Sequence, residues 1–336
     1  IRIWKRVLPF LKPFKKTVAV IVIFNLTCSL VDIAMPLFQR YAIDTFIEQK
    51  TLDGIWKFGL VYFLVVGFQF LSVVLFTRGS ASLEMYLGKT MKRACFVHLQ
   101  GLSFSYYNVT PVGYILSRVM SDTDRIAGMV AWNLTDMMWA LVYVLGVFAA
   151  MLALNWKLAL IIMSIVPALA VLTWYFQNKI LRWNRKVRKI NSRITSGYNE
   201  GIMGAQTSKT LVIEEKNLGE FQEVTEEMRT AAIRAARLSA VYVPLVLFCG
   251  SLATAIVVGK GGQMVLDNLL MIGTLSAFTS YAVGIFEPIQ QLARNLAELI
   301  SIQANIERVT TLLDQKPTVK DSPEVVEKYG DTFHPK

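Results

Sequence analysis

Residues 105–126 read SYYNVTPVGYILSRVMSDTDRI, a polar and charged stretch between two long apolar runs. A membrane protein normally joins such runs by a short loop, and this connection is far longer. Pro111 and Gly113 lie close together within it, which is typical of a chain reversal. The stretch therefore indicates a folded segment that lies away from lipid and contacts something outside the membrane.

The apolar runs that flank this stretch belong to a strongly hydrophobic chain. Of its 336 residues, 54% are hydrophobic. A run of about 20 apolar residues is long enough to cross a hydrocarbon core of ~30 Å as a helix. The sequence thus predicts an all-α membrane protein with six long helices. The expected spans are residues 18–38, 55–77, 129–154, 158–176, 238–258 and 265–286.

The net charge of +11 is distributed in a way that indicates membrane orientation rather than nucleic-acid binding. One group of Lys and Arg precedes the first span, and a second, Lys179 to Arg193, follows the fourth. The connections after spans one, three and five are short and carry few basic residues. The positive-inside rule therefore places the N-terminus, the long connections and, with six spans, the C-terminus in the cytoplasm.

Cysteine and histidine are too few and too scattered for a metal site. Cys28, Cys95 and Cys249 lie in helical, mostly apolar stretches, and His98 and His334 are the only histidines. No ligand spacing typical of a metal centre occurs. We expect inert thiols, no metal and no histidine-based catalytic triad.

The two long connections have the composition of helices rather than loops. The simplest interpretation is that the membrane helices continue into the cytoplasm as stalks, where about 25 extra residues would project ~37 Å. Each pair of stalks must reverse at its far end, near Leu102–Gly113 and near Gly204–Lys209. Tyr106 and Tyr107 offer amphipathic surface for docking at the first reversal; the alternative is a solvated loop.

The basic stretch KILRWNRKVRK at 179–189 repeats a cationic residue at every third position, as a voltage sensor does. A voltage-sensing helix needs apolar residues between its charges, whereas Asn184 and Lys186 intervene here. A stalk or a membrane-surface anchor near anionic headgroups is the favoured interpretation.

A few polar residues within or beside the expected spans are candidates for a substrate path. A charge in hydrocarbon costs about 2.5–3.5 kcal/mol on insertion scales, so it should face an interior or a partner. Contact with substrate and a structural hydrogen bond to a neighbouring helix both remain open. The candidates are Asp32, Asn133, Asp136, Glu287 and Gln290.

Five segments together resemble the transmembrane half of an ABC exporter, the type with six long helices, and the likeness covers nearly the whole chain. LSFSYYNVTPVGYILSRVMSDTDRI is similar to the first intracellular loop, and LNWKLALI at 154–161 to the turn between spans three and four. The other three are YNEGIMGAQTSKTLVIEEKNLGEF at 198–221, IGTLSAFTSYAVGIFEPIQQLA at 272–293 and NIERVTTLLDQKP at 305–317. They resemble the second loop, the sixth span and the exit towards the nucleotide-binding domain.

The resemblance implies that residues 1–314 form such a transmembrane domain. A second half, identical or different, would complete a domain-swapped dimer of twelve helices around the path of a hydrophobic or amphipathic substrate. Each loop would carry a coupling helix that docks on an ATP-binding domain. The matching positions are Tyr106, Tyr107, Gly113, Ser117, Arg118 and Asp122 in the first loop, and Gly204, Thr207 and Lys209 in the second. The family's distribution suggests a bacterial plasma membrane.

The motifs for ATP binding are missing from these 336 residues. No G-x-x-x-x-G-K-[ST] phosphate loop and no LSGGQ-like signature occur, and GKGGQ at 259–263 lacks the Ser or Thr after its Lys. We expect no catalytic residue and no cofactor in this chain. ATP and Mg²⁺ would belong to an absent domain, towards which residues 315–336 would form a linker.

Two other classes of function remain open. An ion- or proton-coupled transporter or channel would use Asp32, Asp136 and Glu287 as its titratable groups. It is disfavoured because no potassium-filter motif and no inverted repeat are present. A receptor-like membrane scaffold would use the stalks to bind partners.

Overall fold

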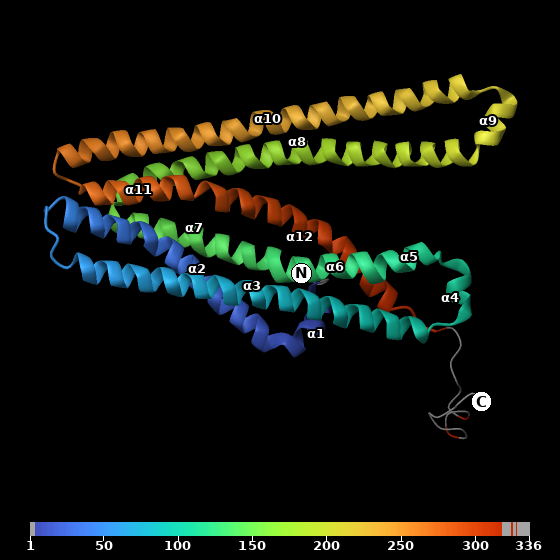
Figure 1. Cartoon of the computed structure of the whole chain (residues 1–336), viewed down its shortest axis with the longest axis horizontal. Coiled ribbons are helices and arrows are strands. Elements are labelled where there is room, and N and C mark those ends of the chain that lie inside the picture. Colours follow the sequence, from blue (N-terminus) through green and yellow to red (C-terminus); the bar gives the residue numbers. More distant parts are fainter. Residues whose placement is uncertain (1–3, 318–323, 325–326, 328–336) are drawn as a thin grey trace. The chain divides into compact units, whose positions relative to one another are not determined.

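The computed structural model describes residues 4–317 together with residues 324 and 327. Throughout these residues the regular structure is helical (Figure 1). Most of the expected linker, 315–336, lies outside the described residues.

The helices follow one another with short connections. The α-helices are α1 (Leu8–Leu11), α2 (Lys15–Ala42), α3 (Ile55–Gln100), α4 (Phe104–Val109), α5 (Val112–Leu116), α6 (Thr123–Gly128), α7 (Leu134–Leu154), α8 (Trp156–Met203), α9 (Ala205–Leu211), α10 (Glu214–Leu266), α11 (Ile272–Gly284) and α12 (Phe286–Leu313). Short 3₁₀ helices are η1 (Trp4–Arg6) and η2 (Lys12–Phe14), and π-helical turns are η3 (Ile43–Ile47), η4 (Ser117–Asp122) and η5 (Met129–Asn133).

Three helices are far longer than a bilayer requires. The lengths of α3, α8 and α10 are 46, 48 and 53 residues. At 1.5 Å per residue they extend about 70–80 Å, whereas the hydrocarbon core is ~30 Å thick. Each therefore combines an apolar part with a polar part of similar length, as the stalk interpretation predicts.

In the described part of the chain, five continuous helical stretches are long and apolar enough to cross a membrane. Within each, only 6–28% of the most apolar window is buried inside the chain, which suits contact with lipid or a second subunit. The stretches are Trp4–Ile47, Ile55–Gln100, Val112–Leu154, Trp156–Met203 and Glu214–Leu266. They contain the first five expected spans.

The sixth expected span, 265–286, differs from the prediction. Val265 belongs to the last turn of α10, and α11 has only 13 residues, about 20 Å. A break at Ile285 separates α11 from α12. Pro288 explains the break, because a proline ring removes one helical hydrogen bond and clashes with the carbonyl four residues earlier, here that of Gly284.

The chain divides into two compact units. The first comprises residues 1–32, 56–143 and 295–336, and the second 33–55 and 144–294. In the first unit, buried apolar residues of α3, α6 and α12 form a continuous core that includes Leu87, Ile126 and Ile306. This core holds the start of the first loop against the end of α12.

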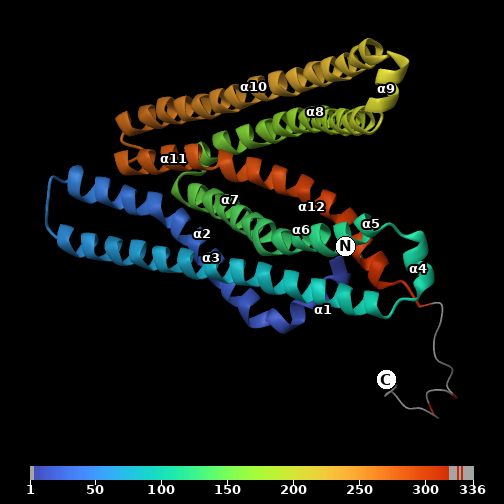
Figure 2. The ribbon, with the colours of Figure 1, turned by 45° about the vertical axis from the view of Figure 1, so that its right-hand side comes forward.

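In the second unit, α8 and α10 lie side by side and antiparallel, and α9 joins them at one end (Figures 1 and 2). Asn155 begins α8, and its side-chain oxygen accepts hydrogen bonds from the backbone N–H groups of Lys157 and Leu158 at 3.1 and 3.2 Å. This N-cap ends α7 and starts α8 with one residue between them.

The N-terminus of α11 is capped from a distant segment. The Gly273 backbone N–H donates to Asp44 Oδ1 at 2.7 Å, and the Tyr281 hydroxyl donates to the Ile33 carbonyl at 2.6 Å. A Cβ atom at Gly273 would lie 2.4 Å from both Asp44 Oδ1 and the Arg40 carbonyl oxygen. Only glycine therefore allows α11 to approach this closely.

We expect Gly273→Ala to lower the free energy of unfolding by about 1–3 kcal/mol, because backbone atoms must move to admit the methyl group. Thermal unfolding of the detergent-solubilised protein measures the effect. Gly259→Ala is the matched control, since Gly259 lies within α10 with no atom within 4 Å of an added Cβ. A control that loses as much stability as Gly273→Ala would contradict the assigned close approach.

Candidate functional site

The first reversal contains a short helix where the sequence predicts a coupling segment. Helix α4 (Phe104–Val109) lies between the end of α3 and the start of α5 (Figure 1). Ser103 before α4 and Thr110 after it are extended, and Pro111 begins the turn into α5. A six-residue helix set between two extended residues presents a compact surface at the end of the polar part of α3.

The most exposed large side chains of α4 are Phe104 and Val109, whereas Tyr107 is 42% exposed and Tyr106 is half-buried. Phe104 is 87% exposed and Val109 is 80% exposed. Tyr106 instead packs against the core of the first unit, and burial raises the pKa of its hydroxyl. The Tyr107 hydroxyl donates to the Leu99 carbonyl at 2.6 Å. The tyrosines thus hold α4 in place, while Phe104 and Val109 face outward.

Asp122 is the centre of a buried polar cluster that joins the first loop to α12. Its carboxylate accepts hydrogen bonds from Arg308 Nε and Nη2 at 2.8 and 2.9 Å, and from Asn305 Nδ2 at 3.0 Å. The Asp122 side chain is only 5% exposed. The hydrogen bonds that Arg308 donates to Asp122 raise the pKa of Arg308. We call Asp122, Asn305 and Arg308 the loop–exit clamp.

Arg118 reinforces this clamp from the preceding turn. Its Nε donates to the Arg308 carbonyl at 3.3 Å, and its guanidinium carbon lies 3.1 Å from the centroid of the Tyr114 ring. Arg118 is buried despite its charge, and it lies with Asp122 in the π-helical turn η4. Such turns occur frequently at functional positions.

The other two predicted residues of the first loop have less distinct environments. Ser117 begins η4. Gly113 lies in α5, where a Cβ atom would meet nothing within 4 Å. Nothing in the structure explains a glycine at this position.

The second reversal contains the second short helix, α9 (Ala205–Leu211). Gly204 joins it to α8, and a Cβ atom there would lie 2.8 Å from the Glu200 carbonyl oxygen, so the turn requires glycine. Thr207 and Lys209 are exposed on α9. Val212 ends the helix in the left-handed region, with φ 55°. Around this end, the apolar residues Ile202, Met203, Leu211 and Val212 are 62–89% exposed.

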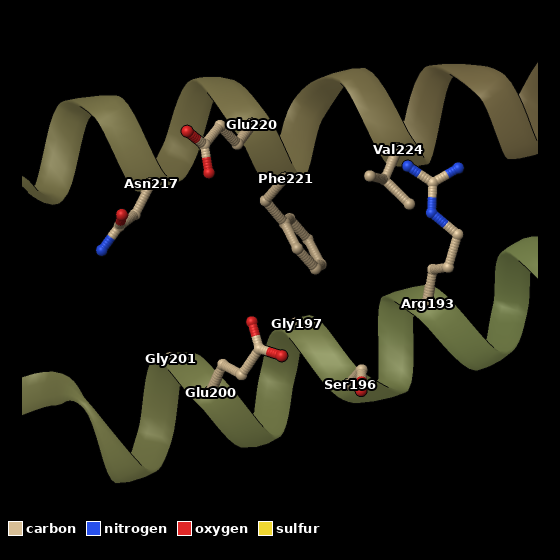
Figure 3. A pocket seen from close by; sticks show the side chains of 9 residues that line it. All are labelled: Arg193, Ser196, Gly197, Glu200, Gly201, Asn217, Glu220, Phe221 and Val224. Carbon is tan, nitrogen blue, oxygen red and sulfur yellow. The ribbon is translucent and has the colours of Figure 1, made fainter.

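Next to this end, α8 and α10 enclose a cavity of about 480 Å³ (Figure 3). Phe221 points from α10 towards α8, where a Cβ atom at Gly197 would lie 3.3 Å from the Phe221 ring. The Tyr198 and Phe221 rings meet edge to face at 4.9 Å. Arg193 donates to Glu227 at 2.7 Å on the membrane-proximal side. These contacts hold the two stalk helices together.

Asp32 has hydrogen-bond partners on two neighbouring helices. One carboxylate oxygen accepts from Gln69 Nε2 on α3 at 2.6 Å, and the other accepts from Trp139 Nε1 on α7 at 3.0 Å. Both oxygens are therefore engaged within the first unit. This arrangement favours the structural interpretation of Asp32 over contact with substrate.

Asn133 lines a cavity of about 420 Å³ in the first unit. Its Nδ2 donates to Glu298 Oε2 at 2.6 Å. Trp132 beside it donates from Nε1 to Glu84 Oε2 at 2.8 Å. The cavity is lined by Arg125, Gly128, Met129, Trp132, Asn133, Glu298, Ser301, Ile302 and Asn305. It combines an aromatic surface with a carboxylate, a guanidinium group and two carboxamides, a lining that suits an amphipathic molecule.

The remaining candidates for substrate contact lie near the N-termini of α7 and α12. Asp136 is in the first turn of α7. In the second unit, Glu287 is exposed in the first turn of α12 and Gln290 is half-buried one turn later.

Comparison with known proteins gives the family. A family model described as "ABC transporter transmembrane region" matches residues 18–289. The chain belongs to this family. The match includes helices α3 to α11 completely, α4 and α9 among them, together with most of α2 and the first turn of α12.

Curated relatives of this ABC transmembrane region extend well beyond it. The Bacillus subtilis "Uncharacterized ABC transporter ATP-binding protein YknV" is 26% identical over 96% of this chain and 54% of its own length. The B. subtilis "Putative multidrug export ATP-binding/permease protein YgaD" is 24% identical over 96% of the chain and 57% of its length. The "ATP-dependent lipid A-core flippase" of Desulfotalea psychrophila is 24% identical over 84% of this chain and 51% of its own length. The chain spans about half the length of these relatives.

Sequence reasoning missed residues that meet across long separations. Asn305 and Arg308 lie within the exit segment 305–317, but no local pattern links them to Asp122. Their spacing of three residues, which puts both on one helix face, is the only local signal. Glu298, on the same face further up α12, was missed for the same reason.

We expect Arg308→Gln to lower the free energy of unfolding of this ABC transmembrane region by about 1–3 kcal/mol, because the buried Asp122 carboxylate loses its charged donor. The expected loss of stability is modest because the Arg308 side chain is 44% exposed, so water screens part of its interaction with Asp122. Chemical denaturation in detergent measures the change. Arg229→Gln, which removes an exposed pair with Glu226, should leave stability unchanged. Equal effects of the two substitutions would show that the clamp contributes no more than a surface ion pair.

Proposed function

We propose that this chain is the membrane-spanning, substrate-translocating part of an ATP-driven exporter. The chain belongs to the ABC transmembrane region family, and one observation about its long helices carries the proposal. Their apolar parts suit a bilayer, and their polar parts end at α4 and α9, which present exposed apolar side chains. Relatives whose names include multidrug export and lipid A-core flipping support an exported, amphipathic substrate.

The proposed assembly has two such chains, identical or different, and twelve spans. In each chain α11 and the first part of α12 together would supply the sixth span, since α11 alone is too short. Positive charge before the first span and after the fourth favours cytoplasmic termini. The Bacillus relatives favour a bacterial plasma membrane. ATP and Mg²⁺ would be bound by a separate domain, because this chain has no phosphate loop.

The substrate would contact the cavity that contains Asn133 and Glu298. Arg125 and Glu298 place one positive and one negative charge at its wall, which suits a polar or zwitterionic group, and Trp132 would contact an apolar one. Asp136 in the first unit, and Glu287 and Gln290 in the second, remain proposed substrate contacts.

Coupling to ATP hydrolysis would pass through α4 and α9. Phe104 and Val109 on α4 are the proposed anchors for an ATP-binding domain, with Thr207 and Lys209 on α9 as additional contacts. The loop–exit clamp would make the first loop and the end of α12 move together, since Asp122 binds both Asn305 and Arg308. Motion imposed at α4 would thereby reach the helix that lines the cavity.

We expect Phe104→Ser with Val109→Ser to reduce transport by at least about tenfold, because apolar anchors at the centre of an interface carry much of its binding energy. The measurement is ATP-dependent uptake of fluorescent amphiphiles into inverted vesicles that contain the chain with its ATP-binding domain. Substrate binding, followed by fluorescence polarisation, should remain unchanged.

Leu60→Ser with Phe63→Ser is the control for loss of exposed apolar surface, since both residues are exposed in the apolar part of α3. Normal transport in the α4 variant would rule out its proposed role. The function itself is tested by the energy source. Uptake that requires ATP hydrolysis and resists a protonophore supports the exporter, whereas uptake driven by a proton gradient without ATP would favour the ion-coupled alternative.

A further inference from the structure

A second cavity in the stalk pair is lined almost entirely by cations. It lies between α8 and α10 and has a volume of about 560 Å³. Its lining residues are Lys179, Arg182, Trp183, Lys186, Arg234, Arg237 and Leu238. Five of these seven side chains are positively charged and none is acidic. We call this site the basic groove.

Helical spacing brings the charges of two distant segments together. On α8, Lys179, Arg182 and Lys186 recur at intervals of three and four residues, so they lie along one face. On α10, Arg234 and Arg237 are separated by three residues. The basic groove is therefore a defined site between two helices rather than the surface of one charged run.

Most of this charge is not neutralised by the protein. Lys186 pairs with Glu227 at 3.2 Å, but Glu227 also pairs with Arg193 at 2.7 Å. Across the described residues, no carboxylate lies within ion-pair distance of Lys179, Arg182, Arg234 or Arg237. All five cations are exposed to solvent, and facing cations repel one another even there, more weakly than in a buried site. Such an arrangement is stabilised when an anion binds between the helices.

The groove lies where the apolar parts of both helices end. Phe176 of α8 and Tyr242 of α10, with ring centroids 5.7 Å apart, belong to the adjoining apolar cluster. Beyond the cations the chain continues in the polar part of each helix. Trp183 lies within the groove, with the Arg234 guanidinium carbon 5.0 Å from the centroid of its indole ring. Tryptophan beside cations at such a boundary is typical of the headgroup region of a membrane.

Exposed apolar side chains lie next to the groove, on the apolar parts of α8 and α10. Val171 and Trp174 on α8 are 66% and 68% exposed, and Val241 on α10 is 57% exposed. A ligand that fits both features has a phosphate at one end and hydrocarbon at the other. Arginine side chains bind phosphate oxygens through paired N–H donors.

We propose that the basic groove binds the phosphate headgroup of an anionic phospholipid from the cytoplasmic leaflet. Basic pockets between membrane helices on this side of a bilayer bind such headgroups. The apolar surface beside the groove would contact the acyl chains. The basic groove shares no lining residue with the cavity that contains Asn133, and lipid binding needs no ATP, so its test does not depend on the proposed transport function.

The test is lipid binding to the purified protein in detergent, followed by native mass spectrometry. The probes are phosphatidylglycerol, phosphatidylcholine and inorganic phosphate. We expect preference for phosphatidylglycerol, and a loss of about tenfold or more in its affinity in the variant R182Q/R237Q, because each cation near a headgroup strengthens binding severalfold. R182K/R237K, which retains the charge, should keep most of the binding.

The matched control is R185Q/R188Q, which removes two exposed arginines of the same α8 segment that do not line the groove. It should change phosphatidylglycerol affinity less than about twofold, and circular dichroism should show unchanged helicity in every variant. Equal losses in test and control, or equal binding of phosphatidylcholine, would overturn the proposal. Binding of free phosphate as tight as that of the lipid would overturn the lipid assignment.

Discussion

The length of the helices relative to the bilayer is the constraint on which the rest of the structure depends. A helix of 46–53 residues crosses a ~30 Å core with about half of its length. The other half must be polar, must pair with a neighbour, and must reverse at its end. The basic groove at the boundary, the paired α8 and α10, and the short helices α4 and α9 all follow from that division.

Two kinds of local contact hold these long elements in register. Glycines allow backbones to approach, as at Gly273, where the N–H reaches Asp44 directly. Buried polar clusters join segments that are far apart in the chain, as Asp122 joins Arg308. Both kinds are specific to position, unlike the apolar surface, which covers most of each membrane-facing helix. In the proposed account, the buried polar clusters make helices move together, and the apolar surfaces of the membrane-facing parts contact lipid and substrate.

The sequence predicted the features that depend on local signals. Apolar length located five spans, and Pro111, Gly113 and Gly204 located both reversals. It did not predict the break at Ile285, because 265–286 reads as one apolar run and the effect of Pro288 falls four residues upstream. Nor did it predict which side of α4 faces outward, since the core packing of Tyr106 is set by residues of other helices. The loop–exit clamp joins positions 186 residues apart, and the three-residue spacing of Asn305 and Arg308 does not reveal Asp122 as their partner.

Labelling with a membrane-impermeant thiol reagent tests the central claim, that the polar halves of the long helices project from the membrane on the cytoplasmic side. Val109→Cys and Val212→Cys mark the two reversals, and Asn268→Cys marks the α10–α11 turn at the opposite end of α10. Cys28 and Cys95 are buried, and labelling of the unsubstituted protein measures the background from the native cysteines. In membranes that contain this chain without the ATP-binding domain, which would cover Val109, the account predicts that Val109→Cys and Val212→Cys react in inverted vesicles but not in intact cells. Asn268→Cys should do the reverse. Reaction of Val109→Cys or Val212→Cys from outside intact cells would contradict it.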